Sequence, residues 1–137
     1  MFGNDTLTIY NKYFNQEKRE IEYRPTHING VHWYTEQKTQ LDAGKGSVKS
    51  ADLYKIRIYP ESHAQSRTYI DAREYQRLSI DKVDKYWTVD NGDYIAKGIM
   101  TCSCQDLIKM YTQVGRVNSF SDNRKKLIPH IRIGGAA

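Results

Sequence analysis

The sequence predicts one all-β domain, a small antiparallel β-barrel or sandwich with one short helix and long loops. Three observations support this prediction. Short runs rich in Ile, Val, Thr, Tyr and Trp alternate between apolar and polar residues. Pro, Gly and Asn-Gly dipeptides separate these runs. The chain has 137 residues without an internal repeat or a linker, so residues 1–137 are expected to form a single domain.

The first strands are expected within residues 6–35. Residues 6–13 alternate in polarity and are rich in Thr, Ile and Tyr, which favour strands. Residues 21–35 are expected to form a hairpin, because Pro25 interrupts the first run and Asn29-Gly30 favours a tight turn before the second.

A long loop is expected next. Residues 36–51 have no apolar period, and loops of that length in compact domains are usually functional or disordered. Residues 53–59 then resume the strand alternation, which ends at Pro60.

One helix is predicted in the second half of the chain. Asp71 followed by Glu74 has the spacing of a capping box, which favours a short helix over residues 72–78. The helix is too short to be stable alone and is expected to pack on the sheet.

The remaining strands follow the helix. Residues 86–98 are expected to form a hairpin around Asn91-Gly92, the strongest turn dipeptide in the chain. Two further strands are expected at residues 115–120 and 130–133, the last one ending before Gly134-Gly135.

The composition excludes several classes of protein. No apolar run is long enough to cross a membrane, and the N-terminus does not resemble a signal peptide, so the protein is expected to be intracellular when made. The net charge of +5 is modest, which is compatible with passing contact with nucleic acid but not with a dense basic reading surface. Cys102 and Cys104 are too close for an unstrained disulfide and are expected to be inert thiols.

No motif for catalysis or cofactor binding stands out. Gly44-Lys45-Gly46-Ser47 lacks the spacing and the following helix of a phosphate-binding loop. Asp90 and Asp93 bracket a turn, where Asp is common for structural reasons. The protein is therefore expected not to be an enzyme and to bind no metal or cofactor.

The eleven tyrosines are compatible with two roles. Tyr packs well in strands, and it is also enriched at protein interfaces. A sheet that carries aromatic and basic side chains together on one exposed face could also stack the bases of an oligonucleotide.

Several stretches resemble the small head-completion proteins of tailed phages and prophages of Gram-positive bacteria, also called stoppers, head–tail connectors or minor capsid proteins. The matching stretches are LTIYNKY at 7–13, INGVHW at 28–33, ADLY at 51–54, YIDAREY at 69–75, YWTVDNGDYIAKG at 86–98 and PHIRIGG at 129–135. They lie in order over nearly the whole chain. Residues 102–111 and 124–126 depart from the family pattern.

The resemblance implies a structural protein of the virion neck, made in the cytoplasm of the bacterial host. Six or twelve copies would form a ring between the portal-adaptor ring and the tail terminator or tail tube. This ring would close the DNA channel after packaging, contact the packaged DNA end transiently, and offer a docking surface to the tail. No membrane is expected among its partners.

Two segments are candidates for these contacts. The candidate channel loop, within residues 36–51, comprises Lys38, Asp42, Gly44, Lys45, Gly46 and Lys49. The candidate inter-ring contact, within residues 121–137, comprises Arg124, Lys125, Lys126, Pro129 and Arg132. Two alternatives remain open: a tail terminator or another neck or tail ring protein, and a single-strand nucleic-acid-binding β-barrel.

Overall fold

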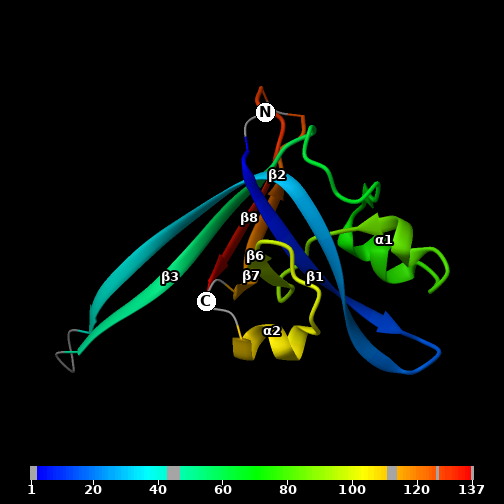
Figure 1. Ribbon diagram of the computed structural model, residues 1–137, viewed down its shortest axis with the longest axis horizontal. Coiled ribbons are helices and arrows are strands. Elements are labelled where there is room, and N and C mark those ends of the chain that lie inside the picture. Colours follow the sequence, from blue (N-terminus) through cyan, green and yellow to red (C-terminus); the bar gives the residue numbers. More distant parts are fainter. Residues whose placement is uncertain (1–2, 43–46, 111–113, 126, 137) are drawn as a thin grey trace.

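The computed structural model describes residues 3–42, 47–110, 114–125 and 127–136. Six strands close into an antiparallel barrel in the order β1-β2-β3-β8-β7-β6 (Figure 1). These strands are β1 (Asp5–Asn15), β2 (Glu20–Asp42), β3 (Ser47–Ile58), β6 (Tyr94–Lys97), β7 (Val114–Asp122) and β8 (Ile131–Ala136). The expected all-β antiparallel barrel is confirmed.

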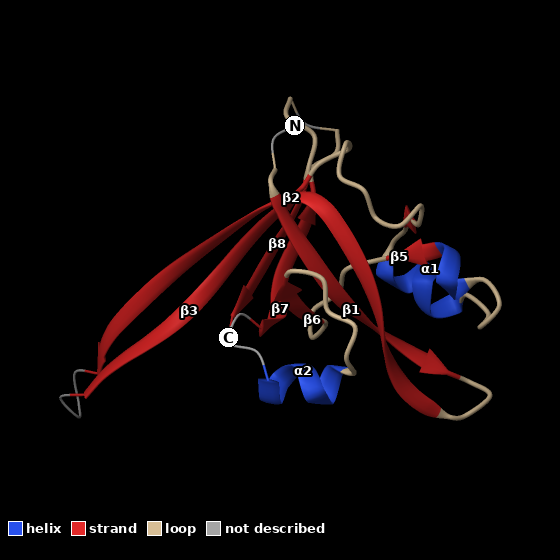
Figure 2. Ribbon diagram, in the orientation of Figure 1, coloured by secondary structure: helices blue, strands red, loops and turns tan. Residues whose placement is uncertain are grey.

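The remaining elements lie outside the barrel wall. Strands β4 (Thr68–Tyr69) and β5 (Tyr86–Trp87) pair with each other in parallel. The described residues form two α-helices where one was expected, α1 (Ala72–Arg77) and α2 (Cys104–Met110), and the 3-10 helix η1 (Val83–Lys85) precedes β5. Figure 2 shows how strands dominate the molecule and how the helices flank the barrel.

The barrel interior is filled by aliphatic and aromatic side chains from all six strands, joined by Trp87 of β5 and by Val89. The core cluster comprises Leu7, Ile9, Ile28, Val31, Trp33, Tyr54, Ile56, Ile58, Trp87, Val89, Ile95, Val117, Ile131 and Ile133. Burial of apolar area at this density is the main stabilising contribution to such a domain. The predicted alternation of β3 is confirmed here, since Tyr54, Ile56 and Ile58 point inward while Lys55 and Arg57 are exposed.

The hairpin expected over residues 21–35 is wrong, because these residues form one continuous part of β2. Gly30 has a φ of 77° and lies where the β1–β2 register shifts, so it forms a β-bulge instead of a turn. Strand β2 pairs with β1 up to Val31 and with β3 from His32 onward. Pro25 is tolerated because it pairs with β1 alone, leaving its other side off the ladder.

The loop expected over residues 36–51 is also wrong. Residues 37–42 of β2 pair in register with residues 47–52 of β3, from Gln37 opposite Asp52 to Asp42 opposite Ser47. Among the described residues these two segments pair only with each other, and we call them the ribbon. Figure 1 shows the ribbon extending away from the barrel. Its strands need no apolar alternation because they do not cover the core.

The turn at Asn91-Gly92 is confirmed, but the hairpin around it is wrong. The amide of Asp93 donates to the carbonyl of Asp90 at 3.2 Å, and Gly92 has a φ of 93°. Strand β5 pairs with β4, whereas β6 pairs with β1 and β7. The turn therefore joins two separate sheets.

Strand β8 continues through Gly134-Gly135, where the sequence suggested its end. A Cβ on Gly135 would lie 2.7 Å from Ile95 Cδ1 and 3.0 Å from the carbonyl oxygen of Arg116. The glycine therefore allows close packing inside the barrel instead of ending the strand.

Asp71 caps helix α1 as predicted, because its Oδ1 accepts a hydrogen bond from the Arg73 amide at 2.8 Å. The buried ring of Tyr75 packs edge-on against Tyr13, with ring centroids 5.9 Å apart. This contact fixes the helix against β1.

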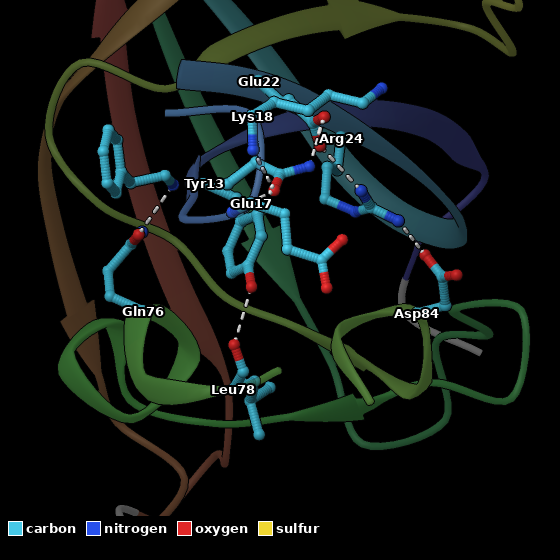
Figure 3. Close-up of polar contacts among 10 residues, drawn as sticks. Tyr13, Glu17, Lys18, Glu22, Arg24, Gln76, Leu78 and Asp84 are labelled. Atoms are coloured by element: carbon cyan, nitrogen blue, oxygen red, sulfur yellow. Dashed lines mark hydrogen bonds and ion pairs between the residues drawn. The ribbon is translucent and has the colours of Figure 1, made fainter. Parts of the chain in front are cut away.

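Hydrogen bonds further attach α1 to the β1–β2 hairpin (Figure 3). The Gln76 amide donates to the carbonyl of Lys12 at 2.5 Å and accepts from the Phe14 amide at 3.2 Å. Tyr13 donates its hydroxyl proton to the carbonyl of Leu78 at 2.7 Å. Strand β6 pairs with β1 only as far as Tyr10. Beyond that point Gln76 supplies hydrogen bonds to the backbone carbonyl of Lys12 and the backbone amide of Phe14 on this edge of β1.

Helix α2 was not predicted from the sequence. Ser103 Oγ accepts from the Asp106 amide at 3.3 Å, and Leu107 packs with Tyr10 on the outside of the barrel. The i, i+3 spacing of Ser103 and Asp106 is the helix-start pattern that could have indicated it.

Candidate functional site

The candidate channel residues lie on the ribbon where the structure describes them. Lys38 pairs with Ala51, Gln40 with Lys49, and Asp42 with Ser47. Gly44, Lys45 and Gly46 lie outside the described residues. Each segment of the ribbon spans six residues, which corresponds to about 20 Å of extended strand. The structure therefore places Lys38, Asp42 and Lys49 on paired strands that project from the barrel, not in a loop.

The candidate inter-ring residues do not form one cluster. Arg124 makes a two-pronged ion pair with Asp122, from Nε to Oδ1 at 2.8 Å and from Nη2 to Oδ2 at 2.7 Å. This pairing lowers the pKa of the Asp122 carboxyl. The guanidinium of Arg124 also lies over the ring of Tyr69, 4.9 Å from its centroid. Arg124 is thus engaged by groups of its own chain.

The rest of the segment is more accessible. Lys125 is exposed, Pro129 is half-buried, and Lys126 lies outside the described residues. Leu127 and Ile128 precede Pro129 in the chain. Leu127 is fully exposed, and Ile128 is exposed as well. An apolar side chain that lies free on the surface costs solvation free energy and is typical of contact surfaces when it is clustered with others.

Arg132 belongs to a different surface, formed by the outward-facing side chains of β2, β3, β8 and β7. The register places His32 opposite Arg57 and Arg57 opposite Arg132. The next row places Tyr34 opposite Lys55. These side chains line a hollow of about 430 Å³, together with Ser119, Ile133 and Gly134. We call the group of His32, Tyr34, Lys55, Arg57 and Arg132 the basic face.

The charge of the basic face is only partly neutralised. Lys55 Nζ lies 3.1 Å from Glu36 Oε2. Among the side chains that the structure describes, no acidic group lies within ion-pair distance of Arg57 or Arg132. Two like charges directly opposite each other on neighbouring strands repel, so this arrangement favours an anionic ligand.

The alternation expected over residues 53–59 places Lys55 and Arg57 on one face of their strand, but it does not by itself single out the basic face. The alternation of β3 was the available signal. Recognising that Arg132 and Tyr34 lie beside Lys55 and Arg57 requires the cross-strand register, which the sequence alone does not give.

The tyrosines largely serve packing. Among the described tyrosines only Tyr34 is exposed, with 51% of its surface accessible.

A second hollow of about 530 Å³ lies beside β4 and β5. Tyr69 and Trp87 line it and pack edge-to-face, with ring centroids 4.9 Å apart. Arg124 forms part of the same wall. The hollow is lined by aromatic groups that already pack against each other.

Asp93 has a structural role at the 90–93 turn. It is buried, and its carboxylate accepts hydrogen bonds from the Lys12 amide at 3.0 Å, Asn11 Nδ2 at 2.9 Å and the Asp90 amide at 3.0 Å. Burial raises the pKa of Asp93 to about 6, and the hydrogen bonds oppose that rise. Its carboxylate holds β1 and the turn together, so these contacts support the structural interpretation of Asp90 and Asp93.

Cys102 and Cys104 are free thiols, and Cys104, the first residue of α2, is buried against Tyr10 and Leu107. Over the described ranges, no group of three or more His, Cys, Asp or Glu side chains is arranged to hold a metal ion. Neither described α-helix has the length and apolar character needed to cross a membrane.

Comparison with known proteins identifies a family for nearly the whole chain. A search of curated proteins and a search of solved structures each gave no significant match. Residues 2–136 match the family described as "Family of unknown function (DUF6751)". The chain therefore belongs to the DUF6751 family.

Proposed function

We propose that this protein is a ring-forming head-completion protein of a tailed phage or prophage. Its place would be in the virion neck, between the portal-adaptor ring and the tail. There it closes the portal channel after DNA packaging and docks the tail. The resemblance of the six sequence stretches to this class of proteins motivates the proposal, and the projecting ribbon is the structural observation that carries it.

The ribbon supports an assembled state because it is exposed on both edges. A two-stranded β-structure without further packing is only marginally stable in water. The six barrel strands close on themselves and leave no unpaired wall strand. In the described residues, the ribbon is thus the extended element whose backbone is best placed to pair with or pack against a neighbouring copy.

Exposed apolar side chains at two other places also support assembly. Phe14 and Ile21 are cross-strand partners near the end of the β1–β2 hairpin, and both are exposed. Leu127 and Ile128 are exposed in the segment before β8. Contacts with adjacent copies and with the rings above and below would remove these side chains from water.

In the proposed ring, the ribbons converge on the central channel. Lys38 and Lys49 then bring positive charge toward the packaged DNA end, while Asp42 lies farther along the same ribbon. The segment that contains Lys125 and Pro129 contacts the adjoining ring. Ring closure requires a heterologous contact, in which one surface of a subunit binds a different surface of the next.

The test is electron microscopy of lysates from a phage or induced prophage that carries a nonsense codon early in this gene. Finished, separate tails beside heads that have packaged and lost their DNA are the expected result. Supplying the intact gene from a plasmid should restore whole particles. Normal particles without the protein would refute the proposal.

One other result would change the proposed position. Full heads beside tails of uncontrolled length would identify the protein as a tail terminator. That outcome would retain the ring but contradict the head-completion role.

A further inference from the structure

The basic face contains features that the proposed neck function does not use. It lies on the outer surface of β2, β3 and β8, whereas the ribbon begins beyond the barrel wall. Its residues come from three strands and are brought together only by the fold. The following inference does not depend on the head-completion role.

The central feature of this surface is the pair Arg57 and Arg132. They are direct cross-strand partners, both are exposed, and neither has an acidic partner among the side chains that the structure describes. A guanidinium group presents several N–H donors in a plane, which matches the oxygens of a phosphate group. A phosphodiester at this position would neutralise the repulsion between the two arginines.

The second feature is an accessible aromatic ring in the same hollow. Tyr34 is half-exposed and lines the hollow of about 430 Å³ together with both arginines. Its cross-strand partner is Lys55, which adds a further positive charge. A ring in this position has a free face on which a nucleobase can stack.

We propose that the basic face binds single-stranded nucleic acid, with backbone phosphates on Arg57 and Arg132 and a base against Tyr34. Single strands fit better than duplexes because the bases of a duplex are stacked inside the helix and cannot reach Tyr34. An acidic peptide would satisfy the arginines but would leave the aromatic ring without a role. The net charge of +5 favours the approach of a polyanion.

The experiment measures fluorescence anisotropy of a labelled oligothymidylate of about twelve nucleotides, a length typical of small β-barrel binding sites. The full-length protein is compared with the double variant Arg57→Ala/Arg132→Ala. The control is Arg73→Ala/Arg77→Ala, which removes the same charge from exposed positions of α1, a helix that packs on β1. Circular dichroism and thermal unfolding show that each variant is folded.

The basic-face variant should bind at least about tenfold more weakly, and the control variant by less than about twofold. The slope of log affinity against log salt should become shallower by about 1.4, since two phosphate contacts on a single strand are lost. Tyr34→Ala should weaken binding at least about fivefold with little change in slope, and Tyr34→Phe should retain it.

Three results would overturn the inference. The first is an equal loss in the two double variants, which would mean that net charge alone attracts the oligonucleotide. The second is equal affinity for a duplex of the same length, or displacement of the oligonucleotide by polyglutamate at equal charge, which would indicate a different partner. The third is no binding by the folded wild-type protein at low salt.

Discussion

Arg57 and Arg132 face each other across the β3–β8 pair on the outer wall of the barrel, and no described acidic side chain lies within ion-pair distance of either. Their repulsion is a cost to the folded state that no described acidic side chain offsets. Unbalanced charge on a sheet is typical of ligand-binding surfaces, where binding is favoured at the expense of the stability of the folded state.

Removing one charge of this pair should stabilise the isolated protein. Arg132→Gln is expected to raise the free energy of unfolding by about 0.2–1 kcal/mol at low ionic strength. The gain should shrink at high salt, because ions screen exposed charges. Urea unfolding at two salt concentrations measures it. A salt-independent loss of stability would show that the arginines do not repel each other significantly.

Shortening the ribbon should separate folding from function. Replacing residues 40–49 by Asn-Gly keeps Thr39 opposite Ser50 and closes the strands with a two-residue turn. The barrel contacts are unchanged, so the thermal unfolding temperature should change by only a few degrees. In a phage, the same variant should give heads that fail to retain DNA, as electron microscopy would reveal. Retained DNA and infectious particles would exclude the ribbon from channel closure.

Asp93 should make stability depend on pH. Because the unfolded carboxyl titrates near 3.8 and the folded one near 6, the folded state holds the proton more tightly. The contribution of Asp93 is therefore greatest below about pH 4 and is lost as the pH rises through 6, by up to about 3 kcal/mol.

Two measurements check this dependence. The unfolding free energy of the wild type should fall relative to that of Asp93→Asn between pH 4 and 7. Carbon NMR of the Asp93 carboxyl should give a midpoint near 6 in the folded protein. A midpoint below 4 would contradict the dominant effect of burial.

Gly135 should not accept a side chain. Gly135→Ala places a Cβ 2.7 Å from Ile95 Cδ1 and is expected to cost about 1–3 kcal/mol of stability. Ile95→Val removes that terminal methyl group, so the double variant should lose less than the sum of the two single variants. Strict additivity in urea unfolding would show that the two positions do not meet.

The two cysteines should differ in reactivity. Burial raises the pKa of the Cys104 thiol to about 11, so very little thiolate forms there at pH 8. Cys102 is partly exposed. A thiol reagent such as DTNB should modify Cys102 quickly and Cys104 only after unfolding. In Cys102→Ser the fast phase should disappear, and a persistent fast phase would show that Cys104 is accessible.

Local sequence patterns predicted the elements whose residues face the core or cap a helix. Leu7 and Ile9 in β1, Ile56 and Ile58 in β3, and Asp71 before α1 all carry patterns that follow from their immediate neighbours. The barrel class follows because several such strands occur without βαβ alternation.

Other features depend on contacts that a local pattern does not contain. Gly30 suits both a tight turn and a β-bulge, and only pairing with β1 selects the bulge. The ribbon is polar because it extends past the core, so it could not be distinguished from a loop. The basic face needs Arg57 and Arg132, which are far apart in the chain and become neighbours only through the β3–β8 register.

Strand β2 belongs to both the barrel wall and the ribbon, which has a mechanical consequence. A pull along the ribbon axis loads the hydrogen bonds of β2 and β3 in shear, so many bonds must break at once instead of one after another. The barrel therefore resists a pull along the ribbon. The ribbon leaves the barrel wall after Glu36 in β2 and before Leu53 in β3, where pairing with β8 begins, so bending of the ribbon relative to the barrel is expected at that point.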